Sequence, residues 1–460
     1  MNSFFRNQPP SVLLLFSLEF WERFSYYGFL GVLILWMTAS PVEGGLGWAR
    51  EAALLLVGSV TGIMWLAPVA GGWVADRFIG ALPAVIFGAF GIALGNALLA
   101  VAAFLPAYLF DVHALSNQTQ LGALEDLFAP TKRLVTIILW LGLISIVVGA
   151  GLLKSNASAL LSQQFSSEDP RRDRAFTIFY MGINLGAMAA PFGAGTLAEA
   201  YGWSYGFVAA AVGMIIGLIF FTWLAKRHIH VPTKSLIVRT DAAATSRFRN
   251  PGIRLVLIMS VFATIFMTGL MQYGGLTNLF GAERVDRTIG GFEIPATWFL
   301  SINPIVIILA GPLVVGLWGK LEDRRGRDLF VTKISSGLFL MAAAFLVLAA
   351  ADAASAGGPV SPLFLIAFWI ILTLGELCLM PVGLALIGRV APAGTVGQLM
   401  GVWLLTMGLG SVIAGWLGAL AQHYGTPFVF GLTAAIGVTG WIILRSFAGP
   451  MEKLAARAVE

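Results

Sequence analysis

Five charged side chains lie inside long apolar stretches of the sequence: Glu19, Glu22, Arg23, Lys154 and Glu376. A charge at the centre of a membrane helix costs about 2.5 to 3.5 kcal/mol on insertion scales, so each one needs a reason. Arg23 and Lys154 can bind a carboxylate, and Glu376 can bind an amine. We therefore expect these charges to line a cavity or to pair with one another.

The first apolar stretch carries its polar residues on one helical face. Glu19, Glu22, Arg23, Tyr26 and Tyr27 follow one another at i, i+3, i+4, i+7 and i+8. At 3.6 residues per turn, this spacing puts all five within a stripe of about 140°. Two acids, one guanidinium and two phenols exceed what an ion network between packed helices requires, so the pattern favours a cavity wall.

The overall composition indicates a membrane protein that must position these residues within a lipid bilayer. The chain has 460 residues, of which 58% are hydrophobic and 11% charged. So few charges cannot cover a water-exposed surface of this size. The net charge of +5 does not indicate a nucleic-acid partner, because the charges lie in loops between apolar runs.

The residue types needed for several other kinds of chemistry are missing from the apolar runs. The single cysteine, Cys378, rules out an intrachain disulfide and a cysteine-based metal site. The four histidines lie in loops, and no Ser/His/Asp, Cys/His or metal-ligand cluster falls within the apolar runs. We expect neither an enzyme nor a metal site.

Twelve apolar runs are long enough, at about 20 residues each, to cross a bilayer as helices. We expect them at about 12–38, 51–74, 80–105, 133–161, 175–198, 203–225, 253–277, 296–318, 330–351, 362–388, 396–421 and 427–446. The predicted fold is an all-α membrane protein. Its predicted organisation is an N-terminal six-helix bundle over 1–225, a cytoplasmic linker over 226–252 and a C-terminal six-helix bundle over 253–460.

The distribution of basic residues predicts the orientation of the chain. With the N-terminus inside, most of the 28 Lys and Arg residues fall in cytoplasmic loops. Both termini are therefore expected in the cytoplasm. Short loops and Ala-rich helices are compatible with a bacterial inner membrane.

The sequence also contains a repeated turn after the second and the eighth predicted helix. Both copies have the pattern G-x-x-x-D-R, as Gly72, Asp76 and Arg77 in the first half and as Gly319, Asp323 and Arg324 in the second. The matched location indicates an internal repeat, and we expect Gly72, Asp76 and Arg77 to form a conformational turn.

The stretch E-F-W-E-R-F-S-Y-Y at 19–27 resembles the first-helix signature E-x-x-E-R-F-x-Y-Y of the proton-dependent oligopeptide transporter family, a branch of the major facilitator superfamily. Five more stretches resemble that family. They are G-A-G-L-L-K-S-N at 149–156, F-Y-M-G-I-N-L-G at 179–186, W-F-L-S-I-N-P at 298–304, G-E-L-C-L-M-P-V-G at 375–383 and M-G-V-W at 400–403. The resemblance covers essentially the whole chain.

The resemblance implies two pseudo-symmetric bundles and proton-coupled symport of di- and tripeptides by alternating access. It implies that no cofactor other than the proton is needed, and we expect a monomer. The proton-coupling residues it implies are Glu19, Glu22, Arg23 and Lys154. The substrate-binding residues it implies are Arg23, Tyr26, Tyr27, Lys154, Asn184, Trp298, Asn303, Glu376 and Trp403.

Two positions depart from the family pattern together. Leu30 and Met271 stand where many relatives carry a base and an acid that close the outer gate. Loss of both partners avoids an unpaired buried charge and predicts an apolar outer gate. It also leaves an alternative open, namely a facilitator or sensor of peptides or related zwitterions with lost or altered proton coupling.

Overall fold

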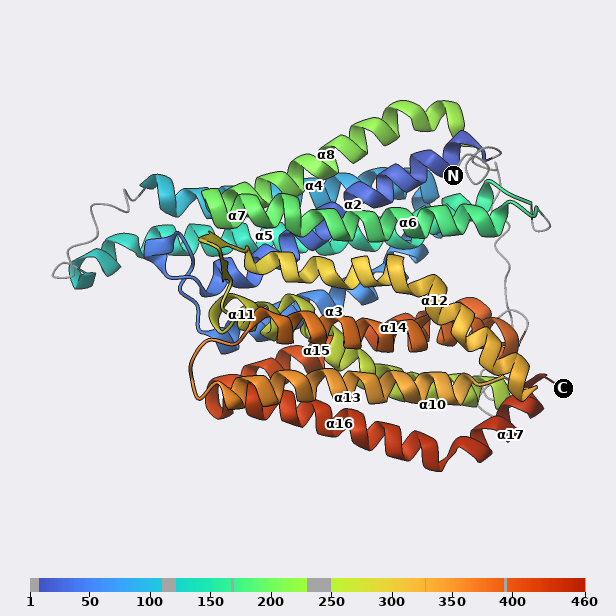
Figure 1. Ribbon diagram of the computed structural model, residues 1–460. Helices are drawn as coiled ribbons and strands as arrows, with labels where there is room; N and C mark the ends of the chain where they lie inside the picture. The colour runs from blue at the N-terminus through green and yellow to red at the C-terminus, as the bar shows by residue number, and fades with distance from the viewer. Residues whose placement is uncertain are drawn as a thin grey trace. The chain divides into compact units, whose positions relative to one another are not determined.

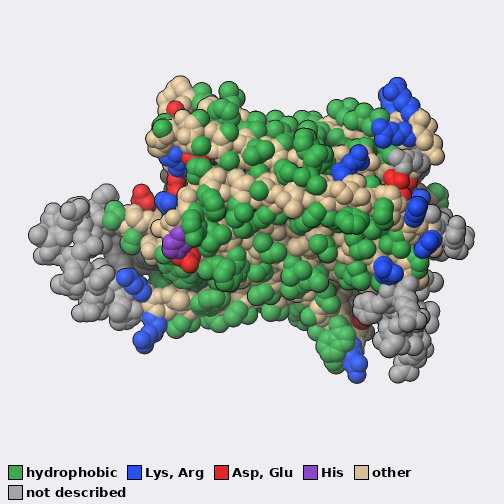
Figure 2. All heavy atoms as spheres, turned by 90° about the horizontal axis from the view of Figure 1, so that it is seen from below, with side chains coloured by type: hydrophobic (Ala, Val, Ile, Leu, Met, Phe, Trp, Pro, Cys, Tyr) green, Lys and Arg blue, Asp and Glu red, His purple; other side chains and the backbone are tan. Residues whose placement is uncertain are grey.

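The computed structural model describes residues 8–109, 121–166, 169–229, 250–326, 328–392 and 395–459. Eleven helical runs in this part of the chain are long and apolar enough to cross a membrane. A twelfth long helix, α2 (Pro10–Thr38), is continuous, but Glu19, Glu22 and Arg23 interrupt its apolar sequence. On the face seen in Figure 2, apolar side chains cover the middle of the helices, and charged side chains gather toward the helix ends.

The helices of the first half follow the predicted spans within a few residues, apart from longer ends (Figure 1). They are α2, α3 (Arg50–Val74), α4 (Ala81–Leu109), α5 (Leu121–Gln163), α6 (Arg172–Ala190), α7 (Thr196–Tyr201) and α8 (Trp203–His228). Short helical segments join or extend them, namely η1 (Pro41–Glu43), η2 (Ala75–Ile79) and η5 (Pro191–Gly195). The predicted linker at 226–252 falls largely on residues 230–249, which lie outside the described residues.

The second half contains elements that the sequence did not predict. Its helices are α10 (Pro251–Leu270), α11 (Leu276–Glu283), α12 (Ile302–Arg325), α13 (Phe330–Ala354), α14 (Pro362–Val390), α15 (Val396–Tyr424), α16 (Thr426–Ser446) and α17 (Ala448–Val459). The segments η6 (Met271–Gly274) and η7 (Ala296–Ser301) adjoin α10 and α12. The predicted span at 253–277 is therefore broken, because α10 ends at Leu270 and a 3-10 turn precedes α11.

A two-residue hairpin follows α11. Strands β1 (Thr288–Ile289) and β2 (Phe292–Glu293) pair antiparallel, with Thr288 opposite Glu293. The turn residues Gly290 and Gly291 have φ values of +58° and +85°. Glycine adopts this left-handed backbone without a Cβ penalty, which is why a Gly-Gly pair suits such a tight turn.

The chain divides into two compact units. Unit 1 contains the described residues of Met1–Ala53, Leu66–Leu236 and Ile294–Pro304. Unit 2 contains the described residues of Leu54–Trp65, Ile237–Glu293 and Ile305–Glu460. Two helices, α3 and α12, therefore contribute to both units.

Close contacts between small residues hold the helices of unit 1 together. A Cβ atom added to Gly71 of α3 would lie 2.1 Å from the carbonyl oxygen of Gly151 in α5. A Cβ atom added to Gly88 of α4 would lie 2.7 Å from the carbonyl oxygen of Gly149. Small residues let membrane helices approach closely and gain van der Waals contact, so α5 packs tightly against both neighbours.

Small residues also allow close contact between α3 and α15 in unit 2. A Cβ atom added to Gly58 would lie 2.7 Å from the carbonyl oxygen of Ser411 and from Cα of Gly415. The aromatic side chains Phe345, Phe368 and Phe430 are fully buried in this unit, and Phe345 contacts both of the others edge-on or tilted. The segment 54–65 of α3 is thus part of the core of unit 2.

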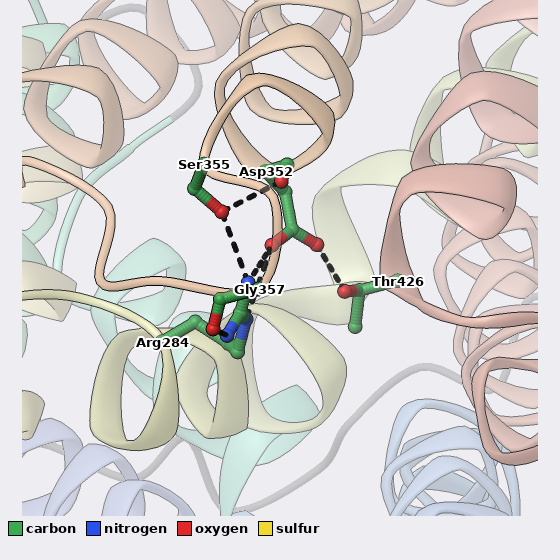
Figure 3. Close-up of polar contacts among 5 residues, drawn as sticks. All are labelled: Arg284, Asp352, Ser355, Gly357 and Thr426. Carbon is green, nitrogen blue, oxygen red and sulfur yellow. Dashed lines mark hydrogen bonds and ion pairs between the residues drawn. The ribbon is translucent and has the colours of Figure 1, made fainter.

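A partly buried ion pair, which we call the Asp352 clamp, joins three segments of unit 2 (Figure 3). Arg284 donates to Asp352 Oδ1 through Nε and Nη2, at 3.1 and 2.7 Å. The same guanidinium donates to the Gly357 carbonyl at 2.8 Å and to Ser355 Oγ at 3.1 Å, and the hydroxyl of Thr426 donates to Asp352 Oδ2. The chain after α11, the end of α13 and the start of α16 therefore meet at one carboxylate.

Candidate functional site

Three charges of α2 form a buried group in unit 1. Glu19, Glu22 and Arg23 are 2%, 1% and 7% exposed. Arg23 Nε lies 2.8 Å from Glu22 Oε2 and 3.7 Å from Glu19 Oε2. The predicted helical stripe thus brings one guanidinium between two carboxylates.

Lys154 of α5 completes what we call the α2 cluster, namely Glu19, Glu22, Arg23, Tyr26 and Lys154. Its Nζ atom lies 4.4 Å from the centroid of the Tyr26 ring, and Cζ of Arg23 lies 5.5 Å from the same centroid. Tyr27 contacts Tyr26 edge-on with ring centroids 5.0 Å apart. An aromatic face attracts cations, so the Tyr26 ring holds two cations around one point.

Hydrogen bonding in the α2 cluster is incomplete. Glu22 Oε2 and Arg23 Nε are buried and close to each other, yet neither has a hydrogen-bond partner of good geometry among the described residues. A buried polar atom without such a partner costs roughly 1 to 3 kcal/mol. A ligand carboxylate or a proton can supply what these two atoms lack.

The other predicted residues of unit 1 lie on separate elements. Asn184 of α6 is buried and donates to the Tyr180 carbonyl at 3.0 Å. Trp298 of η7 donates through its indole nitrogen to Thr196 Oγ1 at 2.7 Å. Asn303 is half-buried in the first turn of α12. These positions leave their substrate-binding roles as predictions.

Two predicted residues belong to unit 2. Glu376 is half-buried near the middle of α14. Trp403 of α15 is only 1% exposed, and its ring lies against Gly383, where an added Cβ atom would be 1.9 Å from Cζ2. Trp403 therefore packs in the core of unit 2 in this structure, and its predicted contact with substrate remains a prediction.

The predicted conformational turn lies at the end of α3 and in η2. Asp76 and Arg77 are exposed, and the Arg77 guanidinium lies about 6 Å from the rings of Trp73 and Phe78. A Cβ atom added to Gly72 would reach Ser155 Oγ only at 3.4 Å, whereas the preceding residue, Gly71, makes the close helix contact.

Leu30 and Met271 lie in different units. Leu30 is buried in α2, and Met271 begins η6. The neighbouring Gln272 is buried, and its amide nitrogen donates to Thr433 Oγ1 at 3.1 Å within unit 2. The apolar outer gate stays a prediction.

Two buried or half-buried acids were missed by the sequence reasoning. Glu199 of α7 accepts hydrogen bonds from residues at the start of η7, and Asp352 of α13 is 3% exposed. Each follows a predicted span by one residue and was therefore assigned to a loop. Their partners are far away in the sequence, so the amino-acid pattern carried no signal for either contact.

Comparison with known proteins gives a consistent result. The model of the POT family matches residues 83–248 and 251–439. An uncharacterized transporter, YclF of Bacillus subtilis, is 30% identical, with 99% of this chain and 96% of the relative covered. The peptide transporter YePEPT of Yersinia enterocolitica is 33% identical, with 90% of this chain and 88% of the relative covered.

Solved structures extend this similarity to the fold. The chain resembles the crystal structure of a peptide transporter POT in complex with sulfate, with a TM-score of 0.83 and 27% identity. A mutant of a peptide transporter POT in complex with alafosfalin gives the same TM-score at 28% identity. Each alignment covers 98% of this chain and 96% of the solved chain. The predicted all-α fold of twelve membrane helices is confirmed.

Proposed function

Because this chain belongs to the POT family, we propose that it imports di- and tripeptides together with protons. The relatives include proteins described as a peptide transporter of Yersinia enterocolitica and a di-/tripeptide transporter of Lactococcus lactis. The observation that carries the proposal for this chain is the α2 cluster, in which Arg23 and the half-buried Lys154 lie near one tyrosine ring and two buried acids lie near Arg23.

The charge balance of the α2 cluster supports proton coupling. When Glu19, Glu22, Arg23 and Lys154 are all ionised, their charges cancel. A peptide carboxylate bound by Arg23 and Lys154 adds one negative charge in a region where water is scarce. Uncompensated charge is costly in such a place, so uptake of one proton by a cluster carboxylate restores neutrality and links the two events.

Glu22 is the carboxylate best placed to take this proton. Arg23 lies beside it, at 2.8 Å, and this contact lacks hydrogen-bond geometry. If a peptide carboxylate draws Arg23 and Lys154 away, Glu22 loses its counterions. Glu19 is the second acid of the pair, at 3.7 Å from the same nitrogen atom.

The peptide ammonium needs an anion, and we assign this role to Glu376. It is a half-buried acid in an otherwise strongly apolar helix. Asn184 and Asn303 supply amide groups for the peptide amide and terminus, and the Trp298 ring lines a pocket for a peptide side chain. Loose contacts to the side chains would let one site accept many peptides.

We further propose that the protein acts as a monomer in the cell inner membrane with both termini in the cytoplasm. The positive-inside distribution of Lys and Arg supports this orientation. The proposal involves no cofactor other than the proton.

Uptake of labelled dialanine into proteoliposomes tests the proposal. We expect the wild-type protein to concentrate dialanine only under an inward proton gradient. Glu22→Gln should lose gradient-driven accumulation while retaining counterflow, because its amide cannot carry the proton. Glu376→Ala should raise the KM about tenfold or more, because the ammonium loses a charged partner.

A matched control is Glu293→Gln, which changes an exposed acid in the hairpin after α11. We expect it to transport like the wild-type protein. A wild-type protein that exchanges dialanine but never concentrates it would overturn symport and favour a facilitator or sensor. Normal accumulation by Glu22→Gln would remove Glu22 from the coupling role.

A further inference from the structure

Glu199 of α7 makes a three-point contact with the segment that precedes α12. Its carboxylate accepts hydrogen bonds from the backbone nitrogen of Ala296 at 2.8 Å and from that of Thr297 at 3.1 Å. The Thr297 hydroxyl adds a third hydrogen bond at 2.9 Å. Ala296 and Thr297 are buried, so this carboxylate satisfies backbone groups that water does not reach.

The contact sits at the start of a helical run. The first N–H groups of a helix have no partner within the helix, and a negative charge at that end is favourable. Glu199 therefore caps η7 from a helix about 100 residues earlier in the chain, as the sequence separation of 97 residues for Ala296 shows. Glu199, which lies outside η7, therefore fixes the residue at which η7 begins.

Neighbouring contacts hold the rest of the segment against the same helices. Ser301 Oγ donates to the Met188 carbonyl at 2.9 Å. A Cβ atom added to Gly195 would lie only 2.1 Å from Thr297 Oγ1, so only glycine allows this approach. The Trp298 ring contacts Phe192 edge-on at 5.1 Å in addition to its bond to Thr196. Residues 296–301 are therefore fixed within unit 1.

Trp298 and Asn303 follow this capped start by two and seven residues. Building on the proposed transport function, we propose that Glu199 is a positioning residue for peptide binding, which holds Trp298 and Asn303 in place by capping η7. Glu199 does not touch the peptide in this scheme. Its removal lets the start of η7 move, and the two binding side chains move with it.

Transport kinetics test the positioning role with a series of variants. Glu199→Ala removes every acceptor and should raise the KM for dialanine about tenfold while Vmax stays within about twofold. Glu199→Gln keeps one acceptor oxygen but brings an NH2 group toward two backbone donors. Its KM should therefore lie between those of the wild type and of Glu199→Ala. The control Glu43→Gln alters an exposed acid of η1 and should leave both constants unchanged.

A labelling experiment tests the contact between Glu199 and the start of η7 without measuring transport. In a Cys378→Ala background, which removes the chain's only cysteine, Ala296→Cys keeps the backbone N–H that Glu199 accepts from. We expect slow reaction of Cys at this position with a maleimide in purified protein. Adding Glu199→Ala should accelerate the reaction about tenfold, and adding Glu43→Gln should not.

The two readouts separate failure of the inference from failure of the proposed function. Faster labelling and a raised KM support the positioning role. Faster labelling in a protein whose wild type does not transport dialanine supports the cap and refutes the peptide substrate. Unchanged labelling in Glu199→Ala, or a lower Vmax at constant KM, overturns the positioning role.

Discussion

Two groups of buried charge in this molecule are built in opposite ways. In the Asp352 clamp, one guanidinium and one carboxylate share hydrogen bonds with Ser355, Gly357 and Thr426. In the α2 cluster, two cations lie near the Tyr26 ring, and the close pair of Glu22 and Arg23 lacks hydrogen-bond geometry. The clamp has its donors and acceptors matched, and the cluster does not.

The difference is the one expected if the clamp serves the structure and the α2 cluster serves the proposed transport. A matched pair gains nothing from a new ligand, since each exchange would break a good hydrogen bond. An unmatched group can accept an anion or a proton without that loss. We infer that burial alone does not mark a transport residue, and that a buried charge pair with incomplete hydrogen bonding is the better candidate.

Removing one acid from each group should give the largest contrast. We expect Asp352→Ala to lower the free energy of unfolding by about 3 kcal/mol, because it leaves the Arg284 charge without its carboxylate. The lower end of the range for buried pairs applies, since the Arg284 side chain is 27% exposed. Thermal unfolding in detergent measures the change.

The matched variant is Glu22→Gln, which we expect to change the free energy of unfolding by less than about 1 kcal/mol, because the pair it breaks has poor geometry. Glu19 still lies 3.7 Å from Arg23 in that variant. An equal loss of stability in the two variants would contradict the comparison.

A further test of buried charge introduces a charge pair at Leu30 and Met271, where we predict an apolar gate. Leu30→Arg alone should reduce dialanine uptake about tenfold, because a buried guanidinium lacks a partner. Leu30→Arg with Met271→Glu should return uptake to within about twofold of wild type. Initial uptake rates in proteoliposomes measure the effect, and equal behaviour of the single and double variants would refute the predicted gate.

The exposed ion pair of Asp169 and Arg171 should give the smallest effect on stability. The hydrogen bonds that Arg171 donates hold the pKa of the Asp169 carboxyl below its usual range. Because the folded pKa is lowered, any stabilisation is present above the ordinary pKa of aspartate and is lost as the pH falls through the folded value.

For Asp169→Asn we expect a change in melting temperature of less than about 1 °C at pH 7, since solvent screens such pairs. At pH values below the folded pKa of Asp169, the variant and the wild type should melt together. Unfolding curves at the two pH values check this, and a shift of several degrees at pH 7 would show that the pair is not merely a surface contact.

Most of the fold could be predicted from the sequence, because long apolar runs leave a membrane chain few choices. The span predicted at 330–351 is seen as Phe330–Ala354, and the one at 362–388 as Pro362–Val390. The break after Leu270 was missed, because the apolar run continues through η6 while the backbone turns at Gly274 and Gly275. The short helix α17 was also missed, because it is too short and polar to span a membrane.

Four members of the α2 cluster, Glu19, Glu22, Arg23 and Tyr26, could be predicted because they share one helix and helical periodicity places them together. The fifth, Lys154, lies on α5, and only the family resemblance assigned it to the same group. Glu199 and Asp352 could not be predicted, since their partners come from elements about 70 to 100 residues away. Only tertiary packing distinguishes them from ordinary charges at helix ends.

The division of α12 between two units also determines when unit 1 can be completed during translation. Residues 294–304 pack on α6 and α7, yet they are translated well after α8 ends at His228. At about 5 to 20 residues per second, the ribosome needs roughly 3 to 13 s to cover that interval. During this time the nascent first half lacks Ala296 and Thr297 as donors for Glu199. Completion of unit 1 is therefore a late event in biosynthesis, and it depends on synthesis of the second half.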